Sequence, residues 1–253
     1  MLIDTHVHLN NDALYEDAEH YIKKANDQGV ERLIVIGYDP VMNQRAIDLA
    51  EKYANVYASV GMHPTYVKNH KESDIKAFTE QLSHPKVRAI GECGLDYHWD
   101  KDNADEQIAI FKKQIELSKK LDMPLSIHMR DATEDTYETL RPYAPLKGVM
   151  HCYSGSAQMA EKFMELGLYV SLGGPVTFKN AKKPKEVAKI VPLDKLLVET
   201  DAPFLAPHPY RGKQNDSSYL PLIAQAIADL KETDFETIAL KTTNNAKTLF
   251  NLE

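Results

Sequence analysis

The sequence predicts a (β/α)8 barrel, that is, a TIM barrel, formed by residues 1–253 as one domain. Eight short apolar segments alternate with amphipathic helical segments, and neither a linker nor a low-complexity stretch interrupts them. A chain of 253 residues also has the usual length of one such barrel. A doubly wound open sheet is the alternative, but it would need a glycine-rich phosphate turn after the first strand, where the chain has Asp4-Thr5-His6-Val7-His8.

Runs of β-branched and other apolar residues, bounded by Gly, Pro, Asn or Asp, predict the strands. The first strand covers residues 1–10 and ends in two histidines, His6 and His8. The other strands are expected at residues 31–37, 56–60, 86–91, 123–128, 148–151, 168–172 and 195–200.

Apolar residues that recur three or four positions apart predict the helices. In residues 12–28 the spacing of Leu14, Ala18, Ile22 and Ala25 fits a helix, and Gly29 ends it as glycines do at the C′ position. Further helices are expected at residues 41–53, 71–82, 102–121, 133–143, 156–166 and 180–190, and two or three more after Tyr219.

Composition and charge limit the possible partners. The net charge is −7, so no broad basic face is expected, which argues against a protein that grips duplex DNA along its length. An enzyme that holds a few phosphates through metal ions remains possible. Two distant cysteines, no signal peptide and no apolar run of membrane-spanning length together predict a cytoplasmic protein without a membrane partner. No obligate protein partner is evident.

Residues that can bind metal stand at the ends of five predicted strands. Active sites of such barrels lie at the carboxyl ends of the strands, so these side chains are expected to meet at one mouth. Buried structural histidines are the alternative, but scattered residues rarely coincide with so many strand ends. The expected ligands are His6, His8, Glu92, His128, His151 and Asp201.

Six nitrogen and oxygen ligands exceed what one tetrahedral zinc ion needs, so we expect two divalent ions, Mg²⁺, Mn²⁺ or Zn²⁺, with Glu92 as the bridge. His6, His8 and Asp201 complete one site, and His128 and His151 the other. Two divalent ions with two carboxylates leave the mouth at a charge of +2, which favours an anionic oxygen substrate, with phosphate as the obvious candidate. Asp201 and Glu92 are the expected catalytic residues, Asp201 as ligand and proton acceptor.

Cys93 and Cys152 are expected to face the helices as structural thiols, because side chains alternate along a strand.

Several other residues are candidates on weaker grounds. Alternation directs Asp4 and Glu199 into the barrel beneath the metals, where we expect them to accept N–H bonds from ligand histidines or to pair with Arg or Lys. Arg130 and Arg211 can bind a substrate phosphate, unless they are surface residues. His63 lies at the end of the third strand, off the metal ring, and either donates to a phosphate or serves the turn before Pro64. Tyr97, with His98 and Trp99, can stack a base or pack a lid.

These motifs, taken together and in order, resemble the TatD family of metal-dependent deoxyribonucleases. The resemblance rests on Asp4-Thr5-His6-Val7-His8, Gly61-Met62-His63-Pro64, Gly91-Glu92-Cys93-Gly94-Leu95-Asp96-Tyr97, His151-Cys152-Tyr153-Ser154-Gly155 and Glu199-Thr200-Asp201-Ala202-Pro203. It implies a TIM barrel of the amidohydrolase type, divalent metals, the metal roles given above and hydrolysis of DNA phosphodiesters. One stretch departs, since the family usually has a basic pair followed by Asn-Glu-Pro, whereas this chain has Asn215-Asp216-Ser217.

Three functions follow as hypotheses. The first is a two-metal phosphodiesterase that acts on DNA ends, an exonuclease-type deoxyribonuclease. The second is a C–N bond hydrolase of the amidohydrolase type, which commonly bridges its metals with a carboxylated lysine, whereas the fourth strand here offers Glu92. The third is a non-catalytic metal-bearing scaffold, which is disfavoured because structural sites need fewer ligands.

Overall fold

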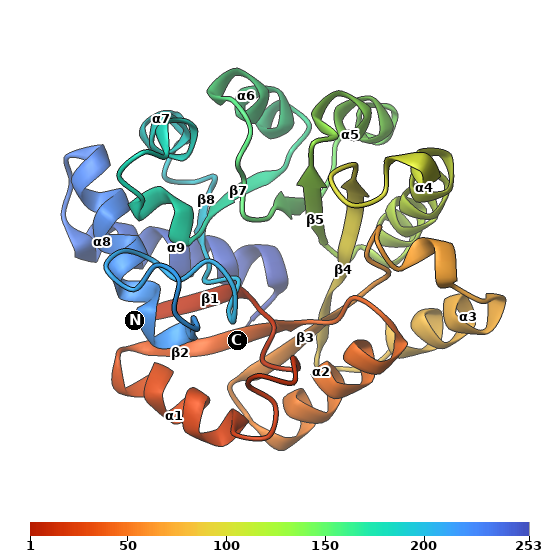
Figure 1. The fold of residues 1–253 in the computed structure, drawn as a ribbon, viewed down its shortest axis with the longest axis horizontal. Coiled ribbons are helices and arrows are strands. Elements are labelled where there is room, and N and C mark those ends of the chain that lie inside the picture. Colours follow the sequence, from red (N-terminus) through yellow and green to blue (C-terminus); the bar gives the residue numbers. More distant parts are fainter. Residues whose placement is uncertain (253) are drawn as a thin grey trace.

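Eight parallel strands form the barrel, and each pairs with the next one along the chain. The computed structural model describes residues 1–252 and confirms the predicted fold class (Figure 1). The strands are β1 (Leu2–Val7), β2 (Val30–Ile36), β3 (Val56–Val60), β4 (Val87–Asp96), β5 (Leu125–Arg130), β6 (Gly148–Met150), β7 (Tyr169–Leu172) and β8 (Leu196–Val198).

Helices cover the outside of the barrel (Figure 1). Seven of them connect successive strands, and two more follow β8. They are α1 (Ala18–Asp27), α2 (Pro40–Lys52), α3 (Glu72–Gln81), α4 (Ala104–Leu121), α5 (Thr133–Leu140), α6 (Ala157–Glu165), α7 (Lys182–Ile190), α8 (Leu220–Lys231) and α9 (Phe235–Phe250).

Two predicted element boundaries were wrong in ways that affect the mouth of the barrel. The helix expected at residues 12–28 begins only at Ala18, because the chain after His8 first folds into turns held by bonds such as Asn11 N–H to His8 O, 2.9 Å. Strand β4 was expected to end at Gly91, yet it continues to Asp96. The extra length of β4 places Asp96 beside β5, where its backbone is in register with that of Arg130.

The end of the barrel opposite the mouth is filled by apolar side chains. Ile3, Ile34 and Leu197 from the strands form one buried cluster with Leu249 and Phe250 of α9. Burial of this apolar surface is the main favourable contribution to folding. Helix α9 thus closes the floor, and the polar side chains of the strands gather at the carboxyl ends.

The seam between β1 and β8 determines where Asp201 lies. The backbone N–H of Asp201 donates to His6 O at 2.9 Å, and that of His8 donates to Ala202 O at 2.8 Å. Asp201 has a φ of 57°, a left-handed conformation in which aspartate is one of the more tolerated side chains. These bonds hold the chain after β8 against the chain after β1, so Asp201 is placed next to His6 and His8.

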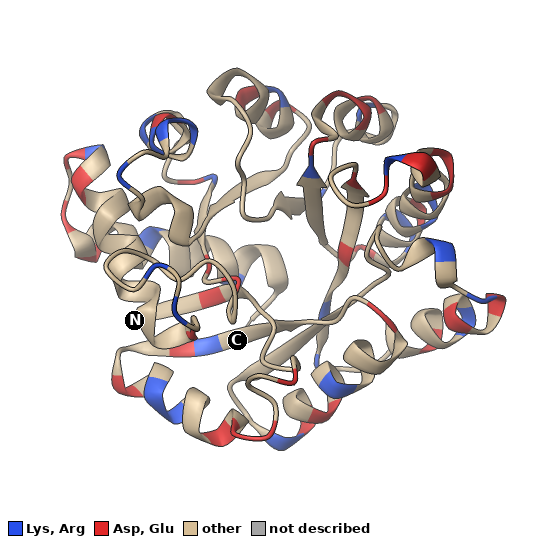
Figure 2. Ribbon diagram, viewed as in Figure 1, with Lys and Arg blue, Asp and Glu red and all other residues tan. Residues whose placement is uncertain are grey.

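Charged residues gather on the outer helices, whereas the strands carry few of them (Figure 2). The two cysteines differ in their burial. Cys93 is buried in the layer between strands and helices, and Cys152 is partly exposed; neither forms a disulfide. Within residues 1–252, no helix is both long and apolar enough to cross a membrane.

Candidate metal centre

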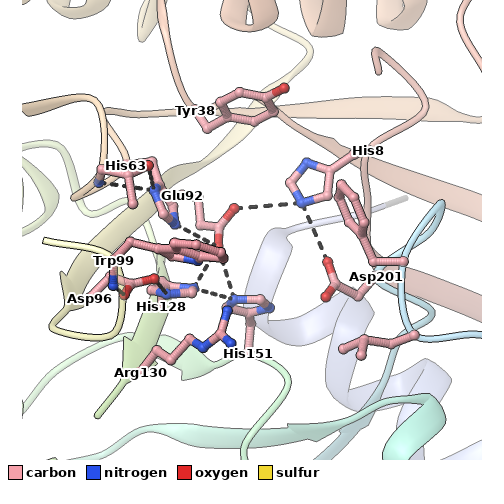
Figure 3. Close-up of a pocket in the computed structure, with 13 residues that line it drawn as sticks. His8, Tyr38, His63, Glu92, Asp96, Trp99, His128, Arg130, His151 and Asp201 are labelled. Carbon is pink, nitrogen blue, oxygen red and sulfur yellow. Dashed lines mark hydrogen bonds and ion pairs between the residues drawn. The ribbon is translucent and has the colours of Figure 1, made fainter. Parts of the chain in front are cut away.

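All six predicted metal ligands meet at the carboxyl ends of the strands. Five of them line a cavity of about 490 Å³, and His6 lies beneath it, fully buried. Figure 3 shows Glu92 in the middle, with His8 on one side and His128 and His151 on the other. The set divides into two groups that share Glu92.

The first group consists of His6, His8, Glu92 and Asp201. The Nε2 atoms of the two histidines lie 3.3 Å apart. Oε2 of Glu92 is 3.7 Å from His6 Nε2 and 3.6 Å from His8 Nε2. Oδ1 of Asp201 lies 3.7 Å and 3.4 Å from the same two nitrogens. Four ligand atoms from three parts of the chain therefore surround one point.

The second group faces the other oxygen of Glu92. Oε1 lies 3.0 Å from both His128 Nδ1 and His151 Nε2. His63 Nε2 is 3.6 Å from the same oxygen. His63 was expected to lie off the metal ring, and that was wrong, because the end of β3 brings it within reach of Glu92 and His128.

Hydrogen bonds on the outer ring nitrogens fix which nitrogen of each histidine faces inward. His8 Nδ1 lies 3.2 Å from the carbonyl oxygen of Ile36, so Nδ1 carries the proton and Nε2 presents a lone pair. His151 Nδ1 lies 3.2 Å from Glu199 Oε1, so Glu199 makes the expected hydrogen bond to this histidine. His6 Nδ1 lies 3.3 Å from Ser126 Oγ.

Asp96 supports the remaining candidate ligand, His128, a role that was not predicted from the sequence. Its Oδ2 lies 3.0 Å from His128 Nε2, so Nε2 is held by Asp96 and Nδ1 is the nitrogen that faces Glu92. The signal that could have revealed Asp96 was its place in the motif after Glu92, four residues along the same strand. Carboxylates that accept from ligand histidines orient the ring and raise its basicity.

The charges of the cluster favour a cation at both groups. Burial alone raises the pKa of Glu92, but His63, His151 and His128 around it hold that pKa well below its ordinary value. Burial lowers the pKa of His151, yet Glu92 and Glu199 together hold it well above the usual range. The carboxylate is therefore ionised among partly cationic imidazoles. A metal ion would take the place of the protons on these imidazoles.

The donor set fits two divalent ions. Imidazole nitrogens and carboxylate oxygens suit Zn²⁺ and Mn²⁺, and carboxylates suit Mg²⁺. The outer nitrogens of His8, His128 and His151 are held by hydrogen bonds, so their inward nitrogens are the ones that would ligate an ion once deprotonated. Glu92 offers one oxygen to each group, as a bridging carboxylate does. His6, His8, Glu92 and Asp201 would hold one ion, and Glu92, His128 and His151 the other.

Asp4 does not support a ligand histidine in the way that was expected. Its carboxylate accepts hydrogen bonds from the Thr200 N–H at 3.0 Å, from the Thr200 hydroxyl, and from the Ser217 hydroxyl at 2.7 Å. From His6 it accepts the backbone N–H and not a ring nitrogen. Irregular pairing of β1 with β2 between Asp4 and Val7 breaks the strict alternation on which the prediction relied. Burial raises the pKa of Asp4 to about 7 despite these donors. Asp4 instead ties β1 to the chain after β8.

The segment that departs from the family pattern takes part in the same connection. Ser217 stands where the family usually has proline, and its hydroxyl donates to Asp4. The buried side chain of Asn215 donates to the carbonyl oxygens of Thr200 and Phe204, at 2.8 Å and 2.6 Å. Asp216 pairs with Lys24 of α1. These side chains therefore brace the loop that carries Asp201.

Of the four residues predicted to contact substrate, two line the cavity and two do not. Arg130 and His63 line it. Tyr97 does not, since its hydroxyl donates to Asp135 at 2.8 Å. Arg211 also lies away from the lining and packs its guanidinium 4.6 Å from the ring centroid of Phe178. Trp99, not Tyr97, is the residue of its aromatic cluster that reaches the cavity.

We expect the carboxylates behind the histidines to control metal affinity. Glu199→Gln and Asp96→Asn each remove a charged acceptor from a ligand histidine, and loss of such a partner typically weakens metal binding by about 10–100-fold. Titration of metal-depleted protein with Zn²⁺ or Mn²⁺, followed by calorimetry, measures the change. Asp122→Asn, at an exposed helix end, is the control and should bind as the parent does. Unchanged affinity in both variants would contradict the assigned role.

Comparisons with known proteins agree with this architecture. The family model described as "TatD related DNase" matches residues 3–251. The uncharacterized metal-dependent hydrolase YabD of Bacillus subtilis is 49% identical over 100% of both chains. The uncharacterized metal-dependent hydrolase TatD of Mycobacterium tuberculosis is 34% identical over 99% of this chain and 98% of its own. The crystal structure of the TatD homolog YjjV from Escherichia coli superposes with a TM-score of 0.95 at 32% identity, covering 100% of this chain and 98% of that one.

Proposed function

The chain belongs to the family of TatD-related DNases and is a metal-dependent hydrolase, and from this premise we propose that it cleaves phosphodiester bonds at DNA ends with two divalent ions. The observation that carries the proposal is the position of Glu92. Its two oxygens face two separate groups of inward-turned ligand atoms. Two bound divalent ions supply charge stabilisation for an in-line displacement at phosphorus and lower the pKa of water.

Asp201 is the proposed proton acceptor of the attacking water. Its Oδ1 faces His6 and His8, which leaves Oδ2 to take the proton. The side chain is largely buried, and the seam between β1 and β8 holds its backbone, so the carboxylate is fixed in direction before substrate arrives.

His63 is proposed to donate a hydrogen bond to a substrate phosphate oxygen. His63 Nδ1 lies 2.7 Å from the Thr65 hydroxyl and 3.2 Å from the Thr65 backbone N–H, so Nδ1 is engaged by Thr65 and Nε2 is the nitrogen that faces the cavity. Burial lowers the pKa of His63 to about 3, so the ring is neutral near pH 7. With its proton on Nε2, the neutral ring would donate to a phosphate oxygen, the role proposed here for His63.

Arg130 supplies a fixed positive charge on the same side of the cavity. It is the last residue of β5, two positions after His128, and it lines the cavity. Arginine binds phosphate through two parallel N–H bonds, so it can orient the phosphate next to the one being cleaved. Among the residues that the structure describes, no lysine lines the cavity, which disfavours a C–N hydrolase with a carboxylated lysine bridge.

We expect hydrolysis to require divalent metal. Exhaustive chelation should abolish cleavage of end-labelled single-stranded DNA, because the buried ligand set cannot stabilise the charge on the phosphate without cations. Adding back Mg²⁺, Mn²⁺ or Zn²⁺ should restore cleavage. Product analysis on a denaturing gel distinguishes loss of single nucleotides from internal cuts, and a panel of amides tests the C–N alternative.

Two results would refute the proposal. One is full cleavage by protein that elemental analysis shows to be free of metal. The other is turnover of amides, but not of DNA, by the metal-loaded protein.

A further inference from the structure

Trp99 is the sole tryptophan of the chain, and it is placed unusually for so large an apolar side chain. It is 69% exposed, and it lines the cavity above the metal ligands. Large apolar side chains are normally buried, so one that stands open beside a binding cavity is a candidate contact for a ligand. Figure 3 shows its ring on the same side of the cavity as His63, His128 and Arg130.

The loop that carries Trp99 is fixed to the metal ligands through Asp96. Oδ1 of Asp96 accepts the backbone N–H groups of His98 and Trp99, each at 3.0 Å. Oδ2 of the same carboxylate holds His128. Asp96 is only 1% exposed, and Gln107 brackets its backbone with bonds of 2.9 Å and 3.1 Å. The distance between Trp99 and the second group of ligands is therefore set by one buried carboxylate.

Arg130 joins Trp99 to make a composite surface. Its guanidinium lies 5.5 Å from the centroid of the Trp99 ring, within the range of a cation–π contact. The guanidinium offers charge for a phosphate, and the indole offers an aromatic face. These are the two chemical features that alternate along a nucleic acid strand.

The opposite rim of the cavity is apolar as well. Phe204 and Leu205, which follow Asp201 in the chain, are 51% and 42% exposed and also line the cavity. The entrance therefore has exposed apolar side chains on two sides, with the charged ligand set between and below them. A ligand with a planar ring next to an anionic group would complement this arrangement.

We propose that Trp99 and Arg130 form a subsite that stacks the nucleobase adjoining the scissile phosphate, while Arg130 faces the next phosphate of the strand. The proposal rests on the proposed phosphodiesterase function and names what distinguishes its substrate from a simple phosphodiester. Stacking needs an unpaired base, and it tolerates any base because each has a π-face. The alternative is that the loop packs over the cavity as a lid and contacts no base. The test must distinguish this alternative from stacking.

Because Trp99 is the sole tryptophan, fluorescence excited at a wavelength that tyrosine does not absorb reports on this subsite alone. The metal-loaded protein is titrated with a dinucleotide whose linkage is a non-hydrolysable methylene phosphonate. It is titrated separately with the same compound lacking its bases, and with inorganic phosphate. We expect saturable quenching by the dinucleotide only. Equal quenching by the compound without bases, or no change with either, would overturn the proposal.

Variants provide the second measurement. Trp99→Ala should raise KM for a short oligonucleotide by about 10–100-fold and leave kcat/KM for an oligonucleotide with abasic ends unchanged, whereas Trp99→Phe should retain most of the affinity. Leu240→Ala, an exposed apolar residue of α9, is the matched control and should change neither. Equal loss on both substrates would show that Trp99 only shapes the loop. If the parent binds the dinucleotide with quenching but hydrolyses no DNA, the proposed function fails and the subsite stands.

Discussion

Asp201→Asn is expected to lower the single-turnover rate of DNA cleavage by about 10²–10⁴-fold, the usual contribution of a general base. Asparagine has nearly the same shape and can still ligate through its carbonyl oxygen, but it is a far poorer proton acceptor. The second ligand group lacks Asp201, so that group should keep its metal. The measurement is cleavage at saturating metal with enzyme in excess, paired with DNA affinity.

DNA affinity separates loss of chemistry from loss of binding. Removing one negative charge from the mouth should leave the affinity for DNA ends equal or higher, even as the chemical step collapses. Asp122→Asn, at the exposed C-terminal end of α4, is the control because it removes the same charge away from the cavity lining. A fall of less than about tenfold in the chemical step would remove Asp201 from the base role and leave His63 or bulk water as proton acceptor.

The sequence predicted most of this site because strand ends are local features. Each apolar segment is short and bounded, so His6, His8, His128 and His151 could be assigned to one edge of the sheet without knowing any tertiary contact. Glu199 beneath His151 followed from alternation along β8, since residues two apart share a face. Closure of the barrel then places the segment after β8 beside the segment after β1, as the fold requires.

The contacts of Asp96 and Asp4, and which residue of the Tyr97-His98-Trp99 cluster reaches the cavity, could not be predicted in this way, because they depend on contacts between distant segments. Asp96 reaches His128 only because β4 continues past its apolar run. Asp4 turns to Thr200 because β1 is irregular, and sequence periodicity cannot show a bulge. Trp99 reaches the cavity through a loop whose path is set by Asp96. Side chains that link one strand to its neighbour therefore escape a prediction that treats strands one at a time.

Glu92→Gln is expected to have a larger effect on metal content than any other single substitution. Each oxygen of Glu92 faces a different pair of histidines, whereas glutamine keeps one oxygen and replaces the other with an NH₂ group. That NH₂ would donate to the inward lone pair of an imidazole and occupy the place of an ion. Metal stoichiometry should fall from two ions per chain to at most one, and DNA cleavage should fall by more than about 100-fold, beyond the effect of losing an outer carboxylate.

Elemental analysis after equilibrium dialysis measures the stoichiometry, and circular dichroism checks the fold. Glu116→Gln, an exposed acid on α4, is the control and should retain both ions. The contrast with Asp201→Asn tests whether Glu92 serves both ions and Asp201 only one, because Asp201 belongs to one ligand group and Glu92 to both. If Glu92→Gln keeps two ions, the shared carboxylate is not a bridge, and each group of histidines must hold its ion independently.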